Sequence, residues 1–106
     1  MEALEALADP TRRRIVELLA ERDRDVGELV AEFPISQPAV SRHLRVLRAH
    51  GLVRARPEAQ RRIYSLEPAP LAELDAWLSR YRGFWQNRLD ALETELARAR
   101  RKRGGS

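Results

Sequence analysis

The 106-residue chain contains no cysteine, and this absence excludes several kinds of chemistry. Without thiols there is no disulfide, zinc ribbon, thiolate metal sensor or cysteine nucleophile. Long apolar runs are also missing, since none approaches the ~18 residues that a membrane-spanning helix needs. No signal-peptide pattern opens the chain. We therefore expect a cytoplasmic protein with no membrane partner.

Lysine is almost absent, because all but one of the 20 basic residues are arginine. The net charge of +4 is unevenly distributed. Residues 36–66 hold seven arginines and one glutamate, a balance of 7 − 1 = +6, and residues 98–103 hold five more cations. Basic segments on an otherwise acidic body indicate a polyanionic partner, although a solvated charged face gives the same counts.

The N-terminal part of the chain is predicted to form short helices with recognisable starts. Asp9 precedes Pro10, a capping residue followed by the proline that suits a first helical turn. The apolar spacing then continues to about Glu21. Asp25 and Glu28 have the spacing of a capping box, which predicts the start of another helix.

Residues 36–50 are predicted to be the second helix of a helix-turn-helix. Pro34 is expected to end the helix before it, and Ser36 to cap this one. Projected at 100° per residue, one side of the helix is apolar and the opposite side is polar and basic. The apolar side holds Val40, Leu44 and Leu47; the outer side includes Ser41, Arg42 and Arg45, with Gln37 at its edge. Arginine and glutamine on such a helix read guanine and adenine edges in a DNA major groove.

After Gly51, short alternating runs over residues 52–56 and 61–66 predict the two strands of a β-hairpin, and residues 57–60 separate them. Its strands carry four arginines. We expect this wing, residues 53–66, to contact the adjacent DNA backbone or minor groove, with the N-terminus of helix 36–50 offering N–H groups to a further phosphate. The expected backbone contacts are Ser36, Arg54, Arg56, Arg61 and Arg62.

From Leu71 a helical pattern continues to about Ala99, and we expect one helix roughly 45 Å long. A small domain alone cannot bury its apolar stripe, which favours a second subunit as its partner. Aromatic residues at 77–85 line either that interface or an effector pocket. We expect one domain over residues 1–100 and a basic flexible tail over 101–106.

The sequence resembles the ArsR/SmtB-type winged-helix regulators of bacteria over about residues 3–96. The resemblance is carried by 6–15, 26–29, 35–44, 47–53 and 62–66, above all by Ser-Gln-Pro-Ala-Val-Ser at 36–41 and Gly-Leu-Val at 51–53. It implies a mainly α fold with a small β-hairpin, a winged helix-turn-helix, and a homodimer joined through the first and last helices. It assigns base reading to Gln37, Ser41 and Arg42, with Arg45 alongside. The expected dimer residues are Leu4, Leu7, Leu74, Leu78, Tyr81, Trp85, Leu89 and Leu92.

The chain also departs from the family pattern. Where thiolate metal sensors have Cys-Val-Cys-Asp-Leu, residues 25–29 read Asp-Val-Gly-Glu-Leu, and the last helix has none of the histidines of the zinc-binding branch. The resemblance therefore predicts no metal and no cofactor at the known family sites, and leaves any effector unknown. Close relatives usually have glycine in the wing where this chain has Ala59.

These observations predict a DNA-binding transcriptional regulator, a dimeric repressor on an imperfect palindrome in double-stranded DNA. The alternative is a protein- or RNA-interaction module built on the same fold, with no specific operator. Catalysis is not expected, because neither Ser36 nor Ser41 is spaced to face His43 as nucleophile and base, and no acid lies behind.

Overall fold

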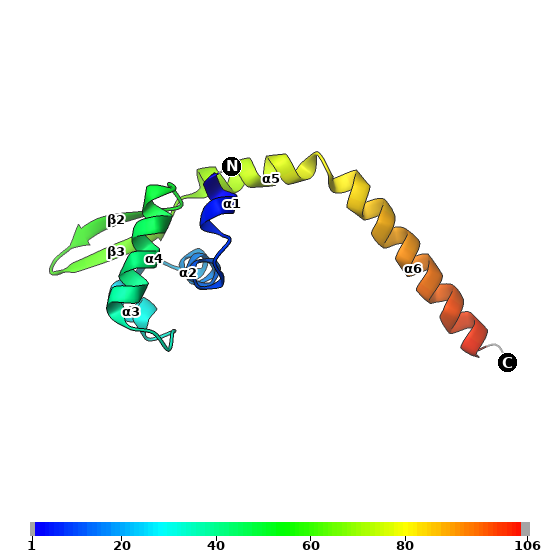
Figure 1. Ribbon diagram of the computed structural model, residues 1–106, viewed down its shortest axis with the longest axis horizontal. Coiled ribbons are helices and arrows are strands. Elements are labelled where there is room, and N and C mark those ends of the chain that lie inside the picture. The colour runs from blue at the N-terminus through cyan, green and yellow to red at the C-terminus, as the bar shows by residue number, and fades with distance from the viewer. Residues whose placement is uncertain (1, 105–106) are drawn as a thin grey trace. The chain divides into compact units, whose positions relative to one another are not determined.

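The computed structural model describes residues 2–104, and the contacts within the chain divide it into two units, residues 1–74 and 75–106 (Figure 1). Its elements are α1 (Glu2–Ala6), α2 (Pro10–Glu21), β1 (Arg24–Asp25), α3 (Val26–Val30), α4 (Gln37–Ala49), β2 (Val53–Glu58), β3 (Arg61–Leu66), α5 (Pro68–Ser79) and α6 (Arg82–Gly104). The prediction of a mainly α winged helix-turn-helix is confirmed, because a helical body carries a small antiparallel sheet and the chain ends in a long helix.

The three helix starts that capping residues predicted are confirmed. Asp9 Oδ2 accepts the backbone N–H of Arg12 at 3.0 Å, and α2 begins at the following proline. Asp25 and Glu28 form a reciprocal capping box on α3, with N···O distances of 2.8 and 3.2 Å. Ser36 Oγ accepts the N–H of Ala39 at 3.3 Å and caps α4.

The end of α3 differs from the expectation. The helix stops at Val30, well before Pro34. Tight i→i−3 bonds follow, from the N–H groups of Glu32 and Phe33 to the carbonyls of Leu29 and Val30. The chain has therefore left the α-helix before the proline is reached.

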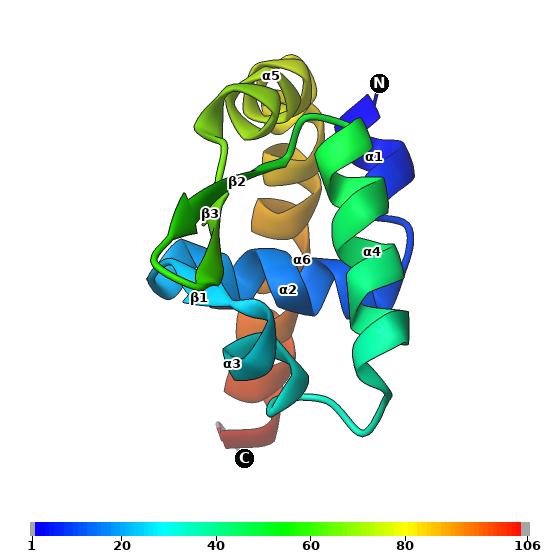
Figure 2. The same cartoon turned by 90° about the vertical axis from the view of Figure 1, so that its left-hand side faces the viewer.

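The core of the first unit lies between α2, α4 and the sheet. Figure 2 shows α2 crossing the middle of this unit, with α4 near one end of α2 and the sheet near its other end. The apolar side predicted for α4 is confirmed, since Val40, Leu44 and Leu47 are fully buried. The further buried apolar residues of this cluster are Ala3, Ala6, Ile15, Leu18, Leu19, Leu29, Leu52, Val53 and Tyr64.

The sheet has three antiparallel strands in the order β1-β3-β2. The two-residue strand β1 was not predicted; it pairs Arg24 with Tyr64 and places β3 in the centre. The hairpin was predicted, but Pro57 and Glu58 belong to β2, so only Ala59 and Gln60 form the turn. Ala59 adopts φ +56°, in the left-handed region where two-residue hairpin turns favour glycine.

The single helix expected over residues 71–99 is wrong, because the chain forms α5 and α6 with a break at Arg80 and Tyr81. At the break, their N–H groups bond to the carbonyls of Trp77 and Leu78 at 3.2 and 3.0 Å, a tighter turn than the α-helix. α6 then continues to Gly104, so residues 101–104, where we expected the basic tail to begin, are helical. The last two residues of that tail, 105–106, lie outside the described residues. Within 2–104, no helix is long and apolar enough to cross a membrane.

Candidate nucleic-acid interface

The outer side of α4 carries the four residues predicted to read bases. Gln37, Arg42 and Arg45 are exposed, and Ser41 is half-buried. Across residues 2–104, the ion pairs formed include neither Arg42 nor Arg45. Both guanidinium groups are therefore available to a ligand.

The N-terminus of α4 has fewer available donors than expected. The hydroxyl oxygen of Ser36 accepts the N–H of Ala39, and the N–H of Val40 bonds to the carbonyl of Ser36 at 3.1 Å. Pro38 has no N–H, which leaves Gln37 as the first-turn amide without an intrahelical acceptor. Ser36 can still donate its hydroxyl proton to a phosphate while it accepts the capping bond.

The wing extends beyond the helices of the first unit (Figure 1), and its pleat separates its four arginines. Side chains alternate between the two faces of a strand, and directly paired residues share a face. The register pairs Arg54 with Ser65, Arg56 with Ile63 and Glu58 with Arg61. The same register places Arg62 on the opposite face, with Tyr64.

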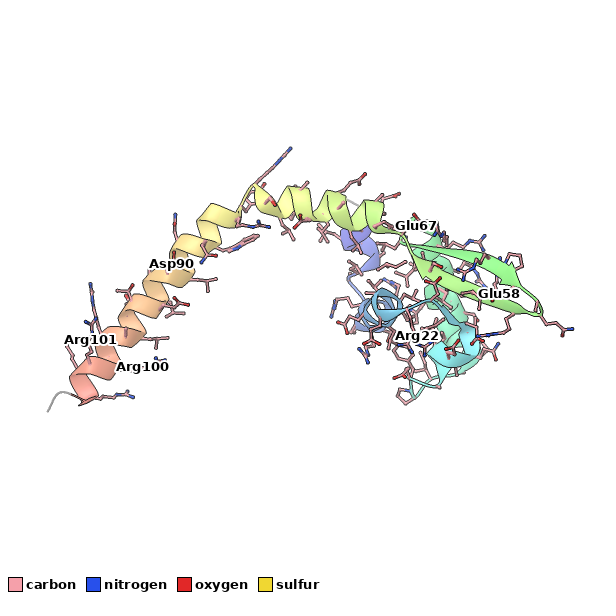
Figure 3. The ribbon with its side chains drawn as sticks, turned by 180° about the vertical axis from the view of Figure 1, so that it is seen from behind. Arg22, Glu58, Glu67, Asp90, Arg100 and Arg101 are labelled. Atoms are coloured by element: carbon pink, nitrogen blue, oxygen red, sulfur yellow. The ribbon has the colours of Figure 1, made fainter. Side chains whose placement is uncertain are left out.

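The three arginines on the first of these faces are paired with carboxylates. Arg54 lies 3.0 Å from Glu67, at the base of the hairpin, and Arg56 lies 2.9 Å from Asp23 and 3.6 Å from Glu58, nearer its tip (Figure 3). Arg56 also donates to the hydroxyl of Ser65 at 2.9 Å. Hydrogen bonds from Arg56 and Ser65 lower the pKa of Asp23.

Arg61 joins β3 to the N-terminus of α3. Its guanidinium contacts Asp25 at 2.7 Å and Glu28 at 2.9 Å, and Glu28 also accepts from Arg22 at 2.6 Å. The backbone N–H of Glu28, followed by the side chain of Arg61, lowers the pKa of Asp25. Arg22, followed by the backbone N–H of Asp25, lowers the pKa of Glu28. Arg61 is therefore a structural link between the wing and the first helix of the helix-turn-helix.

The remaining wing arginine, Arg62, faces α4. A cleft of about 210 Å³ separates the helix from β3 at this point. Two of its lining residues, Arg48 and Tyr64, were not among the residues predicted to contact DNA. Arg48 lies three residues after Arg45 on the same side of α4, and Tyr64 lies two residues after Arg62 on the same face of β3. The periods of a helix and of a strand could therefore have indicated both residues from the sequence. The cleft is lined by Ser41, Leu44, Arg45, Arg48, Arg62 and Tyr64.

Both histidines connect α4 to the N-terminal segment. His43 Nδ1 lies 3.8 Å from Asp9 and 3.5 Å from the guanidinium of Arg12. His50 lies 3.5 Å from Glu5, and its other ring nitrogen contacts the carbonyl of Val46 at 2.9 Å. These contacts link α4 to residues 5–12.

Known proteins are similar to this chain in sequence and in fold. The family model for bacterial regulatory proteins of the arsR family matches residues 9–55. The chain is 51% identical over 87 residues to the HTH-type transcriptional regulator Rv2034 of Mycobacterium tuberculosis, covering 82% of this chain and 78% of that protein. It is 34% identical to the transcriptional repressor SdpR of Bacillus subtilis, over 69% of this chain and 81% of the repressor. A crystal structure described as a possible transcriptional regulator for arsenical resistance has a TM-score of 0.71 and 43% identity, covering 90% of this chain and 96% of that one.

The chain belongs to the ArsR family. It is a DNA-binding transcriptional regulator and not an enzyme. ArsR-family proteins bind DNA and typically dimerise. The comparisons give no support to the alternative of a protein- or RNA-interaction module.

The residues expected at the ArsR-family dimer interface fall into two groups. Leu7 and Leu74 pack against the core of the first unit, and Leu78 and Trp85 are half-buried. The others expose 43–52% of their surface: Leu4, Tyr81, Leu89 and Leu92.

The aromatic segment of the last helices is only partly a cluster. Trp77 and Tyr81 form an edge-to-face pair with centroids 5.2 Å apart. Phe84 is 63% exposed, and the guanidinium of Arg88 lies 4.5 Å over its ring. Among the described residues, no group of three or more metal-ligating side chains comes together. Asp25 stands at one of the family's cysteine positions. Its carboxylate already accepts the backbone N–H of Glu28 as the cap of α3 and forms an ion pair with Arg61.

Proposed function

We propose that this ArsR-family regulator is a dimeric repressor that binds an imperfect palindrome in double-stranded DNA. Each subunit places α4 in a major groove, and the two half-sites are centred about one helical turn, ~34 Å, apart. The observation that carries this proposal is the division of α4 into a fully buried side and an outer side with two unpaired guanidinium groups. Gln37, Ser41 and Arg42 read base edges, with Arg45 beside them.

The backbone contacts follow from the ion pairs of the wing. Arg62 lines the cleft between α4 and β3 together with Arg45 and Arg48. The other three wing arginines are in ion pairs with carboxylates, and they must break these pairs before they can reach a phosphate: Arg54, Arg56 and Arg61. Three free guanidinium groups in each subunit bring about six positive charges per dimer close to the DNA backbone. The logarithm of the binding constant should then fall against the logarithm of salt concentration with a slope of about −5.

The dimer in this proposal forms through α1 and the last helices. Its support is the row of exposed leucines on α6, which an isolated subunit leaves in water. The regulator acts without a metal cofactor at residues 25–29, because Asp25 and Glu28 already hold the cap of α3 and the side chain of Arg61.

Selection from random duplexes, followed by fluorescence anisotropy across a salt series, tests this function. We expect a palindrome, one dimer per site and the steep salt dependence given above. Addition of Zn²⁺ or a chelator should leave the affinity unchanged. Weak binding common to all duplexes, with no enriched sequence, would contradict the proposal.

A further inference from the structure

The cleft between α4 and β3 combines positive charge with hydrogen-bond donors. Arg45 and Arg48 come from the helix and Arg62 from the strand, so three arginines from two elements line one small volume. The lining contains no carboxylate, and the ion pairs among residues 2–104 involve none of the three arginines. An unpaired cluster of like charges is electrostatically unfavourable until an anion enters it.

Besides the three arginines, the lining holds Leu44 and two residues with hydroxyl groups, Ser41 and Tyr64. The ring of Tyr64 is buried in the core, with 8% of the residue exposed, and the residue also lines the cleft. Within residues 2–104, every buried side-chain oxygen has a hydrogen-bond partner. The Tyr64 hydroxyl forms no hydrogen bond with any residue in this range, so it must be open to solvent. Ser41 contributes the second hydroxyl, from α4.

We propose that this cleft is a binding site for a single phosphate group. Guanidinium groups bind phosphate oxygens through paired N–H donors, and the two hydroxyls can each donate one further hydrogen bond. The same chemistry is offered by a phosphodiester of the DNA backbone and by free inorganic phosphate. For the first source the inference rests on the proposed function; for the second it stands alone. If DNA and free phosphate both bind in this cleft, inorganic phosphate should weaken DNA binding more than another salt does at the same ionic strength.

Titration of the ¹⁵N-labelled 106-residue chain with inorganic phosphate tests the site without DNA. Sodium chloride at the same ionic strength is the reference. We expect saturable NMR shifts at the side-chain N–H groups of Arg45, Arg48 and Arg62 with phosphate but not with chloride. Arg48→Gln should abolish saturation, and Tyr64→Phe, which keeps the buried ring, should weaken it roughly fivefold.

Arg14→Gln is the matched control, because Arg14 is an exposed arginine on α2 whose ion pair is with Glu17 at 3.2 Å. This variant should bind phosphate as the wild type does. Equal responses to phosphate and chloride, or equal phosphate binding by wild type and Arg48→Gln, would overturn the inference even if the protein binds DNA well.

DNA binding then separates the two sources of phosphate. On the selected duplex, Arg48→Gln should lose roughly ten- to a hundredfold in affinity. A neutral methylphosphonate at the contacted position should weaken the wild type but not Arg48→Gln. Loss of phosphate binding with unchanged DNA affinity would support the site and assign it to free phosphate. If the wild type binds no duplex, the proposed function fails, and the phosphate titration still decides the cleft.

Discussion

Arg61 and Arg62 are neighbours in β3, yet their side chains lie on opposite faces of the sheet. Arg61 is held 2.7 Å from Asp25, whereas Arg62 lines the cleft beside α4. The two positions therefore allow a matched comparison in which the same charge is removed one residue apart.

Arg62→Gln should weaken DNA binding about tenfold or more, because it removes a charged contact to phosphate. It should also reduce the salt slope by about 2, one for each subunit of the dimer. Arg61→Gln should leave affinity within about twofold, since that guanidinium is already occupied by carboxylates. Anisotropy across a salt series measures both. Equal losses for the two variants would mean that the wing ion pairs open when DNA binds.

Arg42→Ala should change sequence preference more than general affinity. The exposed guanidinium lies on the outer side of α4, where a bidentate contact to guanine discriminates by about 1–3 kcal/mol. The ratio of affinities for the selected and a random duplex should therefore fall, whereas Arg62→Gln should weaken both duplexes alike. A ratio that Arg42→Ala leaves unchanged would remove this residue from the base-reading set.

Much of this site was predictable because its determinants are local. Asp9, Asp25 and Ser36 each accept a backbone N–H within three residues, so their helix starts follow from short spacings. The outer side of α4 follows from a period of 3.6 residues.

The parts that sequence reasoning missed depend on partners far along the chain. The two-residue strand β1 exists because β3 pairs with it, and the pairing of Arg56 with Asp23 joins residues 33 positions apart. The break between α5 and α6 was missed for another reason. The apolar spacing continues through Tyr81, so periodicity alone gave no sign that the helix stops there.

Two backbone positions should respond in opposite directions to exchange of glycine and alanine. Gly51 adopts φ +74° after α4, so Gly51→Ala should lower the free energy of unfolding by about 1–2 kcal/mol. Ala59 carries the same kind of strain at φ +56°, and Ala59→Gly should raise it by up to about 1 kcal/mol. Chemical denaturation measures both changes. A loss of stability in Ala59→Gly would show that the turn does not strain the chain.

The link between Arg61 and α3 should depend on pH. The pKa of Asp25 is lowered from its ordinary value of 3.8, so its stabilising contribution is present above that value and is lost as pH falls through the lowered pKa. Glu28 behaves in the same way, starting from 4.5. The difference in unfolding free energy between wild type and Arg61→Gln should be constant above about pH 5 and shrink below about pH 4. A difference that persists in strong acid would place the effect of Arg61 outside this ion pair.

The exposed leucines of α6 give the last prediction. Leu89 is 51% exposed in the isolated chain, and in the proposed dimer it is covered by the partner subunit. Leu89→Asp should place an unpaired charge in that interface and yield monomers in light scattering, with a matching loss of affinity for the palindrome. Asn87→Asp is the control, because this substitution adds the same charge at a different position. Asn87 lies near the start of α6, about 160° around the helix from Leu89. It should remain dimeric. If Leu89→Asp is also fully dimeric, the subunits associate through a different surface.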